Sequence, residues 1–258
     1  MFLAIDIGNT NISIGLFSTK NKKVLQKPLK VWRMLSLKRK TADEYAVSLI
    51  SMFSYLGFKT EQIKAVATAS VVPCLNGTFE ELAKKYFKKE NFFISKANCG
   101  KMTFSYEVGA DRIANVIAAK SFYGNGGIVI DFGTATTFDC INLNGTYIGG
   151  AISTGPELSA QSLFTHTAQL PKIEIKKPAT AIGSKTVECM QSGIYFGYIG
   201  TIKEIIARIK KETTVKWIIA TGGLSSLVTS EVEEIKAVLP DLTLEGIRII
   251  WEKNNKFL

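Results

Sequence analysis

A carboxylate stands inside the first apolar segment of the chain, in the stretch AIDIGNTNISIG from Ala4 to Gly15. A charged side chain inside a strand is costly unless something pairs with it. Asp6 is followed by Gly8 and then by small amide and hydroxyl residues, namely Asn9, Thr10, Asn11 and Ser13. Glycine lets backbone N–H groups approach a phosphate, and a carboxylate beside a phosphate needs a cation between them, for which Mg²⁺ is suited. The stretch therefore predicts a loop that binds nucleotide phosphates and a metal ion.

A second stretch of the same kind, VIDFGTAT at Val129–Thr136, follows 125 positions later, with Asp131 in the place of Asp6 and Gly133 in the place of Gly8. Its hydroxyl side chains are Thr134, Thr136 and Thr137. Hydroxyls of this kind suit the opposite side of a triphosphate or a bound alkali cation. Either stretch alone could be a turn whose aspartate is satisfied locally. The two together favour a pair of phosphate-binding turns.

Another pair of similar stretches follows in the same order along the chain. AVATASVV at Ala65–Val72 resembles IIATGGLS at Ile218–Ser225, which aligns Thr68 with Thr221. Chance similarity of short apolar strings is the alternative. Two motifs repeated in the same order instead indicate an internal duplication. The glycine pair of the later copy suits close approach to an adenine or a ribose, or else a structural tight turn.

An acid and an arginine stand side by side in VGADRIANVIAA, Val108–Ala119, which has the pattern of a helix. The dipole favours an acid in the first turn, so Asp111 could be there for the helix alone. The alternative is chemical. Asp111 would accept the proton of a substrate hydroxyl that attacks phosphorus, and Arg112 would bind a substrate carboxylate with two hydrogen bonds.

The remaining patterns alternate between strands and helices. Helices are expected over 41–57, 76–89, 108–119 and 187–212, with Thr41 or Asp43 as the cap of the first and Gly57 as its end. A late strand is expected at 217–223, and Leu143–Thr146 holds an Asn-Gly pair that suits a type I′ hairpin turn. Strands followed by alternating helices and strands, twice over, predict an α/β protein with two mixed-sheet domains and a cleft between them.

The chain has 258 residues, 46% of them apolar, which is enough for a sizeable core. Its net charge of +10 suits an anionic partner. Lys20 to Lys40 contains nine cations and no acid. That segment could be a nucleic-acid patch, but no aromatic-rich or helical recognition pattern accompanies it, which favours the solvated rim of a hairpin.

Several other classes of protein are excluded by what the sequence lacks. The four cysteines are Cys74, Cys99, Cys140 and Cys189, and no two have the spacing of a zinc clip. No P-loop motif occurs, and His166, the one histidine, has no acid close to it in the sequence. With no signal-peptide pattern and no apolar run of about 18–20 residues, the chain is expected to be cytoplasmic, with no membrane or nucleic-acid partner.

Taken together, the motifs DIGNTN, GADR, DFGTATTFD, TVECMQSG and TGG occur in the order seen in type III pantothenate kinases. The resemblance covers Phe2 to about Ile250. That family belongs to the superfamily of acetate kinase, sugar kinases, Hsp70 and actin. The resemblance implies a duplicated ribonuclease H-like (actin-like ATPase) fold, with halves at 1–115 and 116–258. It also implies ATP-dependent phosphorylation of pantothenate to 4′-phosphopantothenate, the first step of coenzyme A biosynthesis.

The resemblance also implies roles for individual residues. The first phosphate loop would consist of Asp6, Ile7, Gly8, Asn9, Thr10, Asn11, Ile12 and Ser13, and Thr134 would contact ATP. Contacts to pantothenate would come from Gly109, Ala110, Asp111, Arg112 and Thr186. Asp111 would be the proton acceptor, Asp6 would lie near Mg²⁺, and Asp131 would bind a monovalent cation, K⁺ or NH₄⁺.

In this family the site is completed by a homodimer, and the apolar face of SGIYFGYIG, residues 192–200, could be its interface or simply core. Met102 stands where many relatives have a substrate-facing tyrosine, with Tyr106 nearby. Two other functions stay open: a transcriptional accessory factor without catalysis, and a kinase of the same superfamily for another hydroxy acid or sugar. Intact Asp6, Asp111, Arg112 and Asp131 argue against the regulator.

Overall fold

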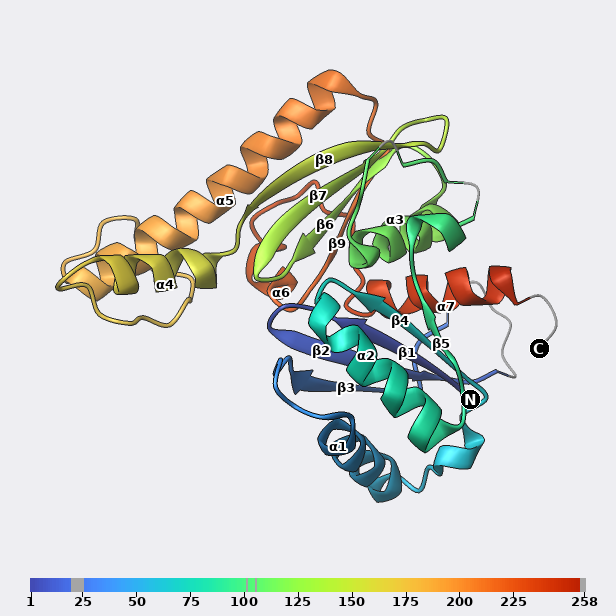
Figure 1. Cartoon of the computed structure of the whole chain (residues 1–258). Helices are drawn as coiled ribbons and strands as arrows, with labels where there is room; N and C mark the ends of the chain where they lie inside the picture. The colour runs from blue at the N-terminus through green and yellow to red at the C-terminus, as the bar shows by residue number, and fades with distance from the viewer. Residues whose placement is uncertain (20–25, 101, 105, 256–258) are drawn as a thin grey trace. The chain divides into compact units, whose positions relative to one another are not determined.

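The computed structural model describes residues 1–19, 26–100, 102–104 and 106–255 (Figure 1). The chain forms two compact units, Met1–Phe122 with Asp241–Leu258, and Tyr123–Pro240. As compact bodies these units differ from the predicted halves, 1–115 and 116–258, because the last helix of the chain packs on the first sheet. Where the duplicated sequence itself divides stays a prediction.

The first unit is built on a five-stranded sheet in the order β3-β2-β1-β4-β5. Its strands are β1 (Phe2–Ile7), β2 (Asn11–Phe17), β3 (Lys30–Leu35), β4 (Ala65–Ser70) and β5 (Asn91–Phe93). β1 pairs with β2 antiparallel and with β4 parallel. Because side chains alternate along a strand, Leu3, Ile5 and Ile7 enter one core while Asp6 lies on the opposite face.

Two helices cover the Leu3 side of this sheet, α1 (Ala42–Tyr55) and α2 (Pro73–Leu82). Thr41 caps α1 as expected, in a capping box with Glu44. Gly57 follows the helix with a φ of +75°. α2 begins three residues before the predicted start, because Pro73 occupies its first turn, and it continues as a π-helical turn, Ala83–Phe87. Short 3₁₀ turns lie at Thr60–Gln62 and Lys96–Asn98.

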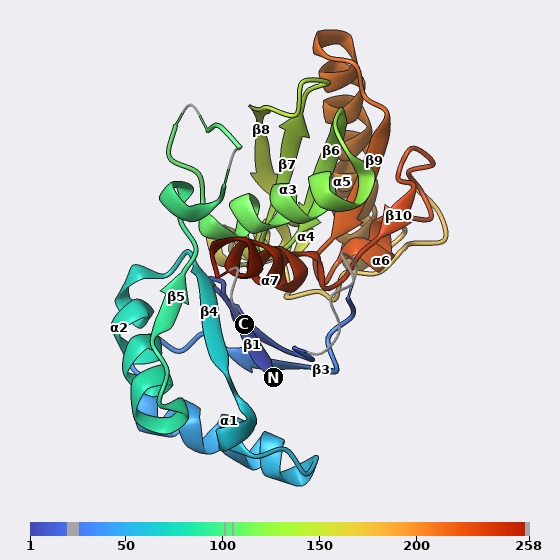
Figure 2. The ribbon, with the colours of Figure 1, turned by 90° about the vertical axis from the view of Figure 1, so that its right-hand side faces the viewer.

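The C-terminal helix α7 (Leu242–Asn254) lies on the other face of this sheet, and α3 (Ala110–Tyr123) packs against it (Figure 2). Phe2 stacks on Trp251 with ring centroids 4.8 Å apart. A Cβ on Gly246 would lie 2.0 Å from the Ala114 carbonyl oxygen, so only glycine permits this close helix contact. α7 therefore supports α3 from below, and α3 carries Asp111.

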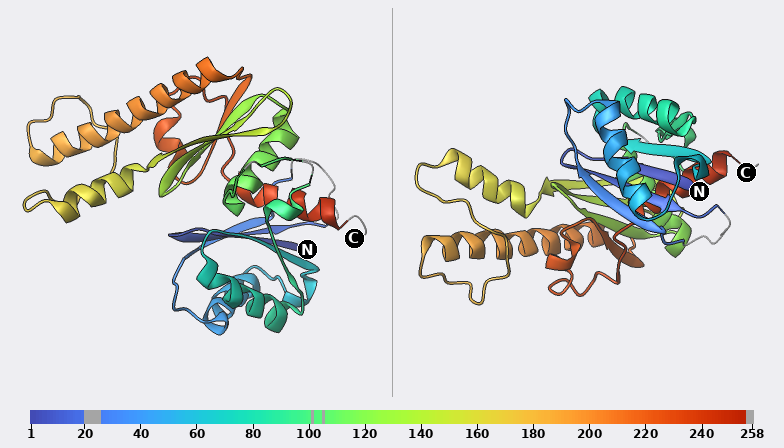
Figure 3. Two further views of the ribbon diagram at one scale, coloured as in Figure 1. Left: turned by 45° about the horizontal axis from the view of Figure 1, so that its top comes forward. Right: turned by 90° about the horizontal axis from the view of Figure 1, so that it is seen from below.

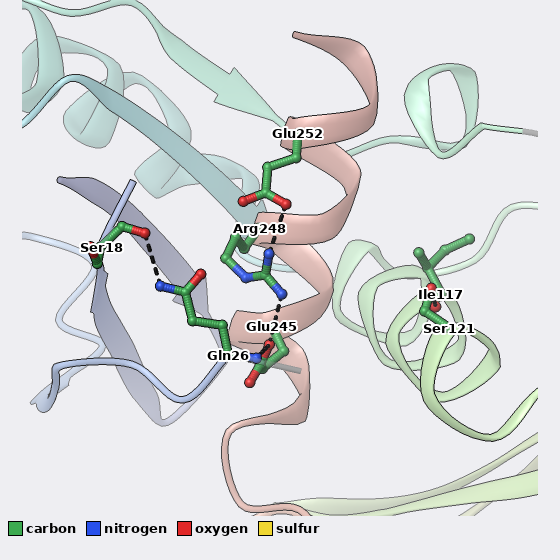
Figure 4. Close-up of polar contacts among 7 residues, drawn as sticks. All are labelled: Ser18, Gln26, Ile117, Ser121, Glu245, Arg248 and Glu252. Carbon is green, nitrogen blue, oxygen red and sulfur yellow. Dashed lines mark hydrogen bonds and ion pairs between the residues drawn. The ribbon is translucent and has the colours of Figure 1, made fainter. Parts of the chain in front are cut away.

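Arg248 forms two ion pairs within α7 (Figure 4). Arg248 is 1% exposed, and its guanidinium donates to Glu245 at 3.1 Å and to Glu252 at 2.7 Å. Glu245 also accepts the backbone N–H of Gln26, whose side chain donates to the Ser18 carbonyl. Both ion pairs lie within α7 and are weak evidence for stability, whereas the bond from the Gln26 N–H to Glu245 joins the helix to another segment of the first unit.

The second unit repeats the architecture of the first. Its sheet has the order β10-β9-β6-β7-β8, with β6 (Gly127–Phe132), β7 (Ala135–Ile141), β8 (Tyr147–Thr154), β9 (Trp217–Thr221) and β10 (Ala237–Val238). Reading β1 to β5 as β6 to β10, both sheets have the same strand order and the same directions. The two mixed sheets confirm the predicted α/β class and the duplicated ribonuclease H-like fold.

One long helix, α5 (Thr186–Glu212), covers the core side of the second sheet. It runs beside α4 (Pro156–His166), as both views of Figure 3 show. A short helix, α6 (Ser225–Val228), follows β9. Among the described residues, no helix combines the length and the apolar character that a bilayer crossing requires.

Two local expectations need correction. Asp6 pairs with Ala69 whereas Asp131 pairs with Thr221, so Thr221 corresponds to Ala69 and not to Thr68. The hairpin between β7 and β8 forms as expected, but Asn144 does not adopt the positive φ that a type I′ turn needs. Only Gly145 does, with φ of +78°, because the turn closes from the Gly145 N–H to the Asn142 carbonyl.

The basic segment from Lys20 to Lys40 falls partly outside the described residues, at 20–25. Its described part includes the edge strand β3, on which Lys30 and Arg33 are exposed. Charged side chains on an edge strand discourage pairing with another chain.

Candidate active site

The predicted phosphate loop is the connection of the β1–β2 hairpin in the first unit. Ile7 pairs with Ile12 at the base of the hairpin, and Asp6 pairs with Ser13 on the face away from α1 and α2. The Gly8 N–H donates to the Asn11 carbonyl at 3.0 Å, which makes the loop tight. The side chains at its tip, on Asn9, Thr10 and Asn11, are all exposed. Ile7 and Ile12 are buried, so only their backbone groups are available to a phosphate.

Two backbone hydrogen bonds hold this loop. The Ser36 N–H, just after β3, donates to the Thr10 carbonyl at 2.9 Å. The Val71 N–H, just after β4, donates to the Ile7 carbonyl at 3.0 Å. The loop is therefore anchored from both neighbouring strands, and it lies at the carboxyl end of β1, where α/β sheets place ligands.

The GADR motif begins α3, and its glycine brings Asp111 to the same end of the sheet. A Cβ on Gly109 would lie 2.5 Å from Asp111 Oδ1 and 3.3 Å from Val71 Cγ1. The same oxygen accepts the Arg112 N–H at 2.7 Å. Gly109 thus has to be glycine for the carboxylate to fold over it, and Val71 connects the motif to the first loop. The structure brings these two predicted groups of site residues together within one unit.

Burial raises the pKa of Asp111 above its ordinary value. The Arg112 amide and the charge of Arg112 act in the opposite direction but do not cancel the effect. A carboxylate with a raised pKa is a stronger base than an exposed one. Ala110 is buried beside it, and Arg112 is half-buried.

The second acidic hairpin lies in the second unit. The ladder register sets Asp131 beside Thr137 on β7 and Thr221 on β9, so three oxygen-bearing side chains share one face of the sheet. After β9 the chain turns at Gly222, with φ of +89°. A Cβ there would lie 2.5 Å from Asp131 Oδ1 and 2.6 Å from the Phe132 carbonyl oxygen. Carboxylate and hydroxyl oxygens are the ligands of hard cations, so this residue set fits an alkali ion or Mg²⁺.

The structure does not bring Thr186 to this hairpin. Thr186 is exposed and starts α5, whereas Tyr198 on the same helix contacts the hairpin. Twelve helical residues between them correspond to about 18 Å. Thr134 is exposed on the loop, and its carbonyl accepts the Gly155 N–H at 3.1 Å.

A groove of about 870 Å³ runs between α4, α5 and the end of β8. Its lining includes His166, Cys189 and Tyr198, and none of the predicted site residues. In the stretch 192–200, Tyr195, Tyr198 and Ile199 belong to the core of the second unit, which is the simpler of the two expectations for that stretch. Met102 is buried and Tyr106 is exposed, so the role of either toward a substrate stays a prediction.

Sequence reasoning missed Tyr198 and Thr136 as partners. Their hydroxyl oxygens are 2.5 Å apart and buried. The signal was a tyrosine in an otherwise apolar helical stripe, which calls for a buried hydrogen-bond partner. The sequence does not say which residue that partner is.

Comparison with known proteins agrees with the motifs. The model of the family described as type III pantothenate kinase matches residues 2–208. A curated relative of that name from Endomicrobium trichonymphae is 61% identical over 257 residues, covering 98% of this chain and 99% of its own.

Among solved structures, a protein from Sinorhizobium meliloti assigned as a 2-dehydro-3-deoxygalactonokinase has a TM-score of 0.62 at 10% identity, covering 100% of this chain and 98% of its own. One from Campylobacter jejuni, assigned to the Baf family of transcriptional activators, has a TM-score of 0.61 at 20% identity, covering 99% and 100%. At these identities the two structures show the fold alone. The family model and the full-length identity show that the chain belongs to the type III pantothenate kinase family.

Proposed function

We propose that this chain transfers a phosphoryl group from ATP to the primary hydroxyl of pantothenate, which gives 4′-phosphopantothenate and ADP and begins coenzyme A biosynthesis. The observation that carries the proposal is the placement of Asp111. Its half-buried carboxylate folds over Gly109 at the start of α3, beside the strand ends that carry the Asp6 loop. Membership of the family supports the same activity.

Asp111 acts as the general base. It takes the proton of the substrate hydroxyl while that oxygen forms its bond to the γ-phosphorus and the bond from phosphorus to the β–γ bridging oxygen breaks. Arg112, next to it, binds the substrate carboxylate through its planar guanidinium. Gly109 and Ala110 form the same turn, where the glycine leaves room for the Asp111 carboxylate that faces the substrate.

The loop from Asp6 to Ser13 binds the phosphates of ATP. Its exposed amide and hydroxyl side chains and its backbone N–H groups are donors, and the bonds from Ser36 and Val71 hold it in place before ATP arrives. Asp6 supplies a carboxylate for Mg²⁺, which neutralises phosphate charge when it is bound. Thr134 donates to ATP from the second hairpin. Asp131 binds the monovalent cation, K⁺ or NH₄⁺, with the hydroxyls of Thr137 and Thr221 beside it.

We also propose that two copies assemble through α4 and α5. Thr186 lies about 18 Å along α5 from Tyr198, the residue of that helix that contacts the hairpin, and we propose that Thr186 contacts the pantothenate of a partner subunit. Leu158, Leu163 and Phe164 on α4 are exposed beside the groove that the partner would cover. Sedimentation of the purified chain should give the mass of a dimer, and a monomer at micromolar concentration would contradict this.

The test of the activity is ADP release with pantothenate, Mg²⁺ and K⁺ present. Asp111→Asn keeps the shape and removes the base, so kcat should fall by about 10²–10⁴-fold. Asp43→Asn is the control, because Asp43 is an exposed acid paired with Lys85 on the helical side of the first sheet. No pantothenate-dependent turnover by the wild type would instead favour the regulator, and turnover with a sugar alone would favour the other superfamily kinase.

The raised pKa of Asp111 makes a second, thermodynamic prediction for the same variant. The folded chain keeps this proton to higher pH than the unfolded chain, so ionised Asp111 lowers the free energy of unfolding at neutral pH. Asp111→Asn should therefore unfold at the same or a higher Tm at pH 7, and the gain should vanish below about pH 4, where both states are protonated. Activity of the wild type should fall on the acid side at a pH above the ordinary aspartate value of about 3.9.

A further inference from the structure

Tyr198 of α5 contacts the second hairpin from its core side, at the last strand pair before the loop. Phe132 and Thr136 pair directly opposite each other where β6 and β7 meet the loop. The Tyr198 ring packs against Phe132, with centroids 6.3 Å apart and the planes at 76°. Its hydroxyl shares a 2.5 Å hydrogen bond with the hydroxyl of Thr136. Tyr198 therefore touches both strands of the hairpin at the last pair before the loop.

These contacts lie on the face opposite to the ligand-binding side chains. Phe132 and Thr136 point into the core with Tyr198, whereas Asp131 and Thr137 belong to the alternate set of the same strands. Tyr198 is buried and has no direct access to a ligand on the Asp131 side. Any effect of its hydroxyl on that ligand must act through the hairpin.

Two backbone hydrogen bonds also restrain this loop. The Gly155 N–H holds the Thr134 carbonyl from β8, and the Leu224 N–H holds the Phe132 carbonyl at 3.2 Å from β9. Tyr198 adds a restraint from a third direction. Burial and the charge of Asp131 raise its pKa to about 12, so the phenol keeps its proton at working pH and the hydrogen bond persists.

We infer that Tyr198 is a positioning residue: through Thr136 and Phe132 it holds the β6–β7 hairpin in the geometry that binds the nucleotide and the monovalent cation. The inference rests on the proposed function for the identity of the ligands. The hydroxyl is the specific element, because the ring would pack equally well without it.

The test compares Tyr198→Phe with Tyr195→Phe. Tyr195 lies on the same helix, is buried in the same core and donates its hydroxyl to the Leu227 carbonyl at 3.3 Å, away from the hairpin. Binding of a non-hydrolysable ATP analogue with Mg²⁺ and K⁺ is measured by calorimetry. Because Tyr198→Phe removes one hydrogen bond that positions the hairpin, its affinity for the ATP analogue should be about 5–10-fold weaker. The affinity of Tyr195→Phe should be unchanged. In turnover assays, KM for ATP and the K⁺ concentration for half-activation should rise, while KM for pantothenate should not.

A second pair of variants separates positioning from stability. Thr136→Val should weaken binding as much as Tyr198→Phe, Thr136→Ser should retain it, and the double variant Tyr198→Phe/Thr136→Val should be no weaker than either single variant. The double variant leaves no unmatched hydroxyl, so its Tm should recover while its affinity does not. Equal losses for Tyr198→Phe and Tyr195→Phe, or full affinity in the double variant, would overturn the inference.

The binding assay contains no pantothenate, so it still measures the effect of Tyr198 on nucleotide affinity if the chain phosphorylates another substrate. A changed oligomeric mass in Tyr198→Phe would also overturn the inference, since it would assign the effect to the α4–α5 groove that Tyr198 lines.

Discussion

The two acidic hairpins share their strand directions, but the first loop, 8–11, is one residue longer than the second, 133–135, and different contacts hold the last strand pair before each loop. The first closes on Ile7 and Ile12, two apolar side chains in a core with α1 and α2. The second closes on Phe132 and Thr136, and Thr136 is hydrogen-bonded to a tyrosine of α5. In both hairpins the aspartate lies one residue before the last strand pair, on the face of the sheet away from the core. The two units therefore share their strand order, whereas the core-facing side chains at the end of each hairpin differ: apolar in the first and hydrogen-bonded in the second.

The backbone anchors are also repeated, with a second difference in length after the parallel strand. The strand after each hairpin holds the loop through one N–H, from Ser36 in the first unit and Gly155 in the second. The parallel strand holds the end of the aspartate strand from Val71 or Leu224. Val71 lies two residues after Ala69, the partner of Asp6, whereas Leu224 lies three residues after Thr221, the partner of Asp131. The positive φ of Gly222 accommodates the additional residue. The turn beside Asp131 is therefore one residue longer than the turn beside Asp6, and its glycine lies against the Asp131 carboxylate.

The comparison is tested most strongly by removing each carboxylate in turn. Asp6→Asn should lower kcat by about 10²–10³-fold, because a divalent ion on the transferring phosphates stabilises charge that develops in the transition state. Asp131→Asn should lower it only about 10-fold and raise the K⁺ requirement, since a monovalent ion contributes less. Steady-state assays across K⁺ concentrations measure both. Equal losses at saturating K⁺ would contradict distinct roles for the hairpins.

Gly222→Ala should destabilise the chain by about 3 kcal/mol, because the new Cβ would meet Asp131 Oδ1 and the Phe132 carbonyl in a conformation that favours glycine. Gly223→Ala is the matched control, since a Cβ there has nothing within 4 Å, and it should stay within about 0.5 kcal/mol of the wild type. Urea unfolding measures both. Similar midpoints for the two variants would show that the tight turn is not required.

The smallest effects are expected when the core-facing residue at the end of each hairpin, Ile12 or Thr136, is changed from apolar to polar or the reverse. Ile12→Thr should cost about 1–2 kcal/mol more than Ile12→Val, because it buries a hydroxyl in a core whose buried tyrosine, Tyr45, already bonds to the backbone of Leu35 and Leu37. In the second unit the sign is reversed: Thr136→Val should destabilise by about 1 kcal/mol, since the hydroxyl there is bonded to Tyr198. Thermal unfolding distinguishes the two. A stabilising Thr136→Val would mean that the polar base contributes nothing.

Much of the site was predictable because its residues are close together in the sequence. Gly109, Asp111 and Arg112 occupy one helical turn, and the loop from Asp6 to Ser13 is a single hairpin. Local rules on glycine, caps and alternation are sufficient for such segments. The second repeat was aligned one residue off along its strand, because Thr68 and Thr221 match in type while the ladder pairs Ala69 and Thr221 with the aspartates. Two strands with the same apolar composition can be aligned at several offsets, so their sequences alone do not show which residues pair with the aspartates.

From the amino-acid sequence alone came the two aspartate turns, the helix that carries Asp111 in its first turn, the α/β class and its duplication. Each of these depends on residue types within a few positions, or on a repeat that can be read directly. Three features needed the folded chain: the seating of α7 on the first sheet, the contact of Val71 with Gly109, and the bond between Tyr198 and Thr136. All three join segments that are distant in sequence, and close packing, which selects such partners, acts only when the core is assembled.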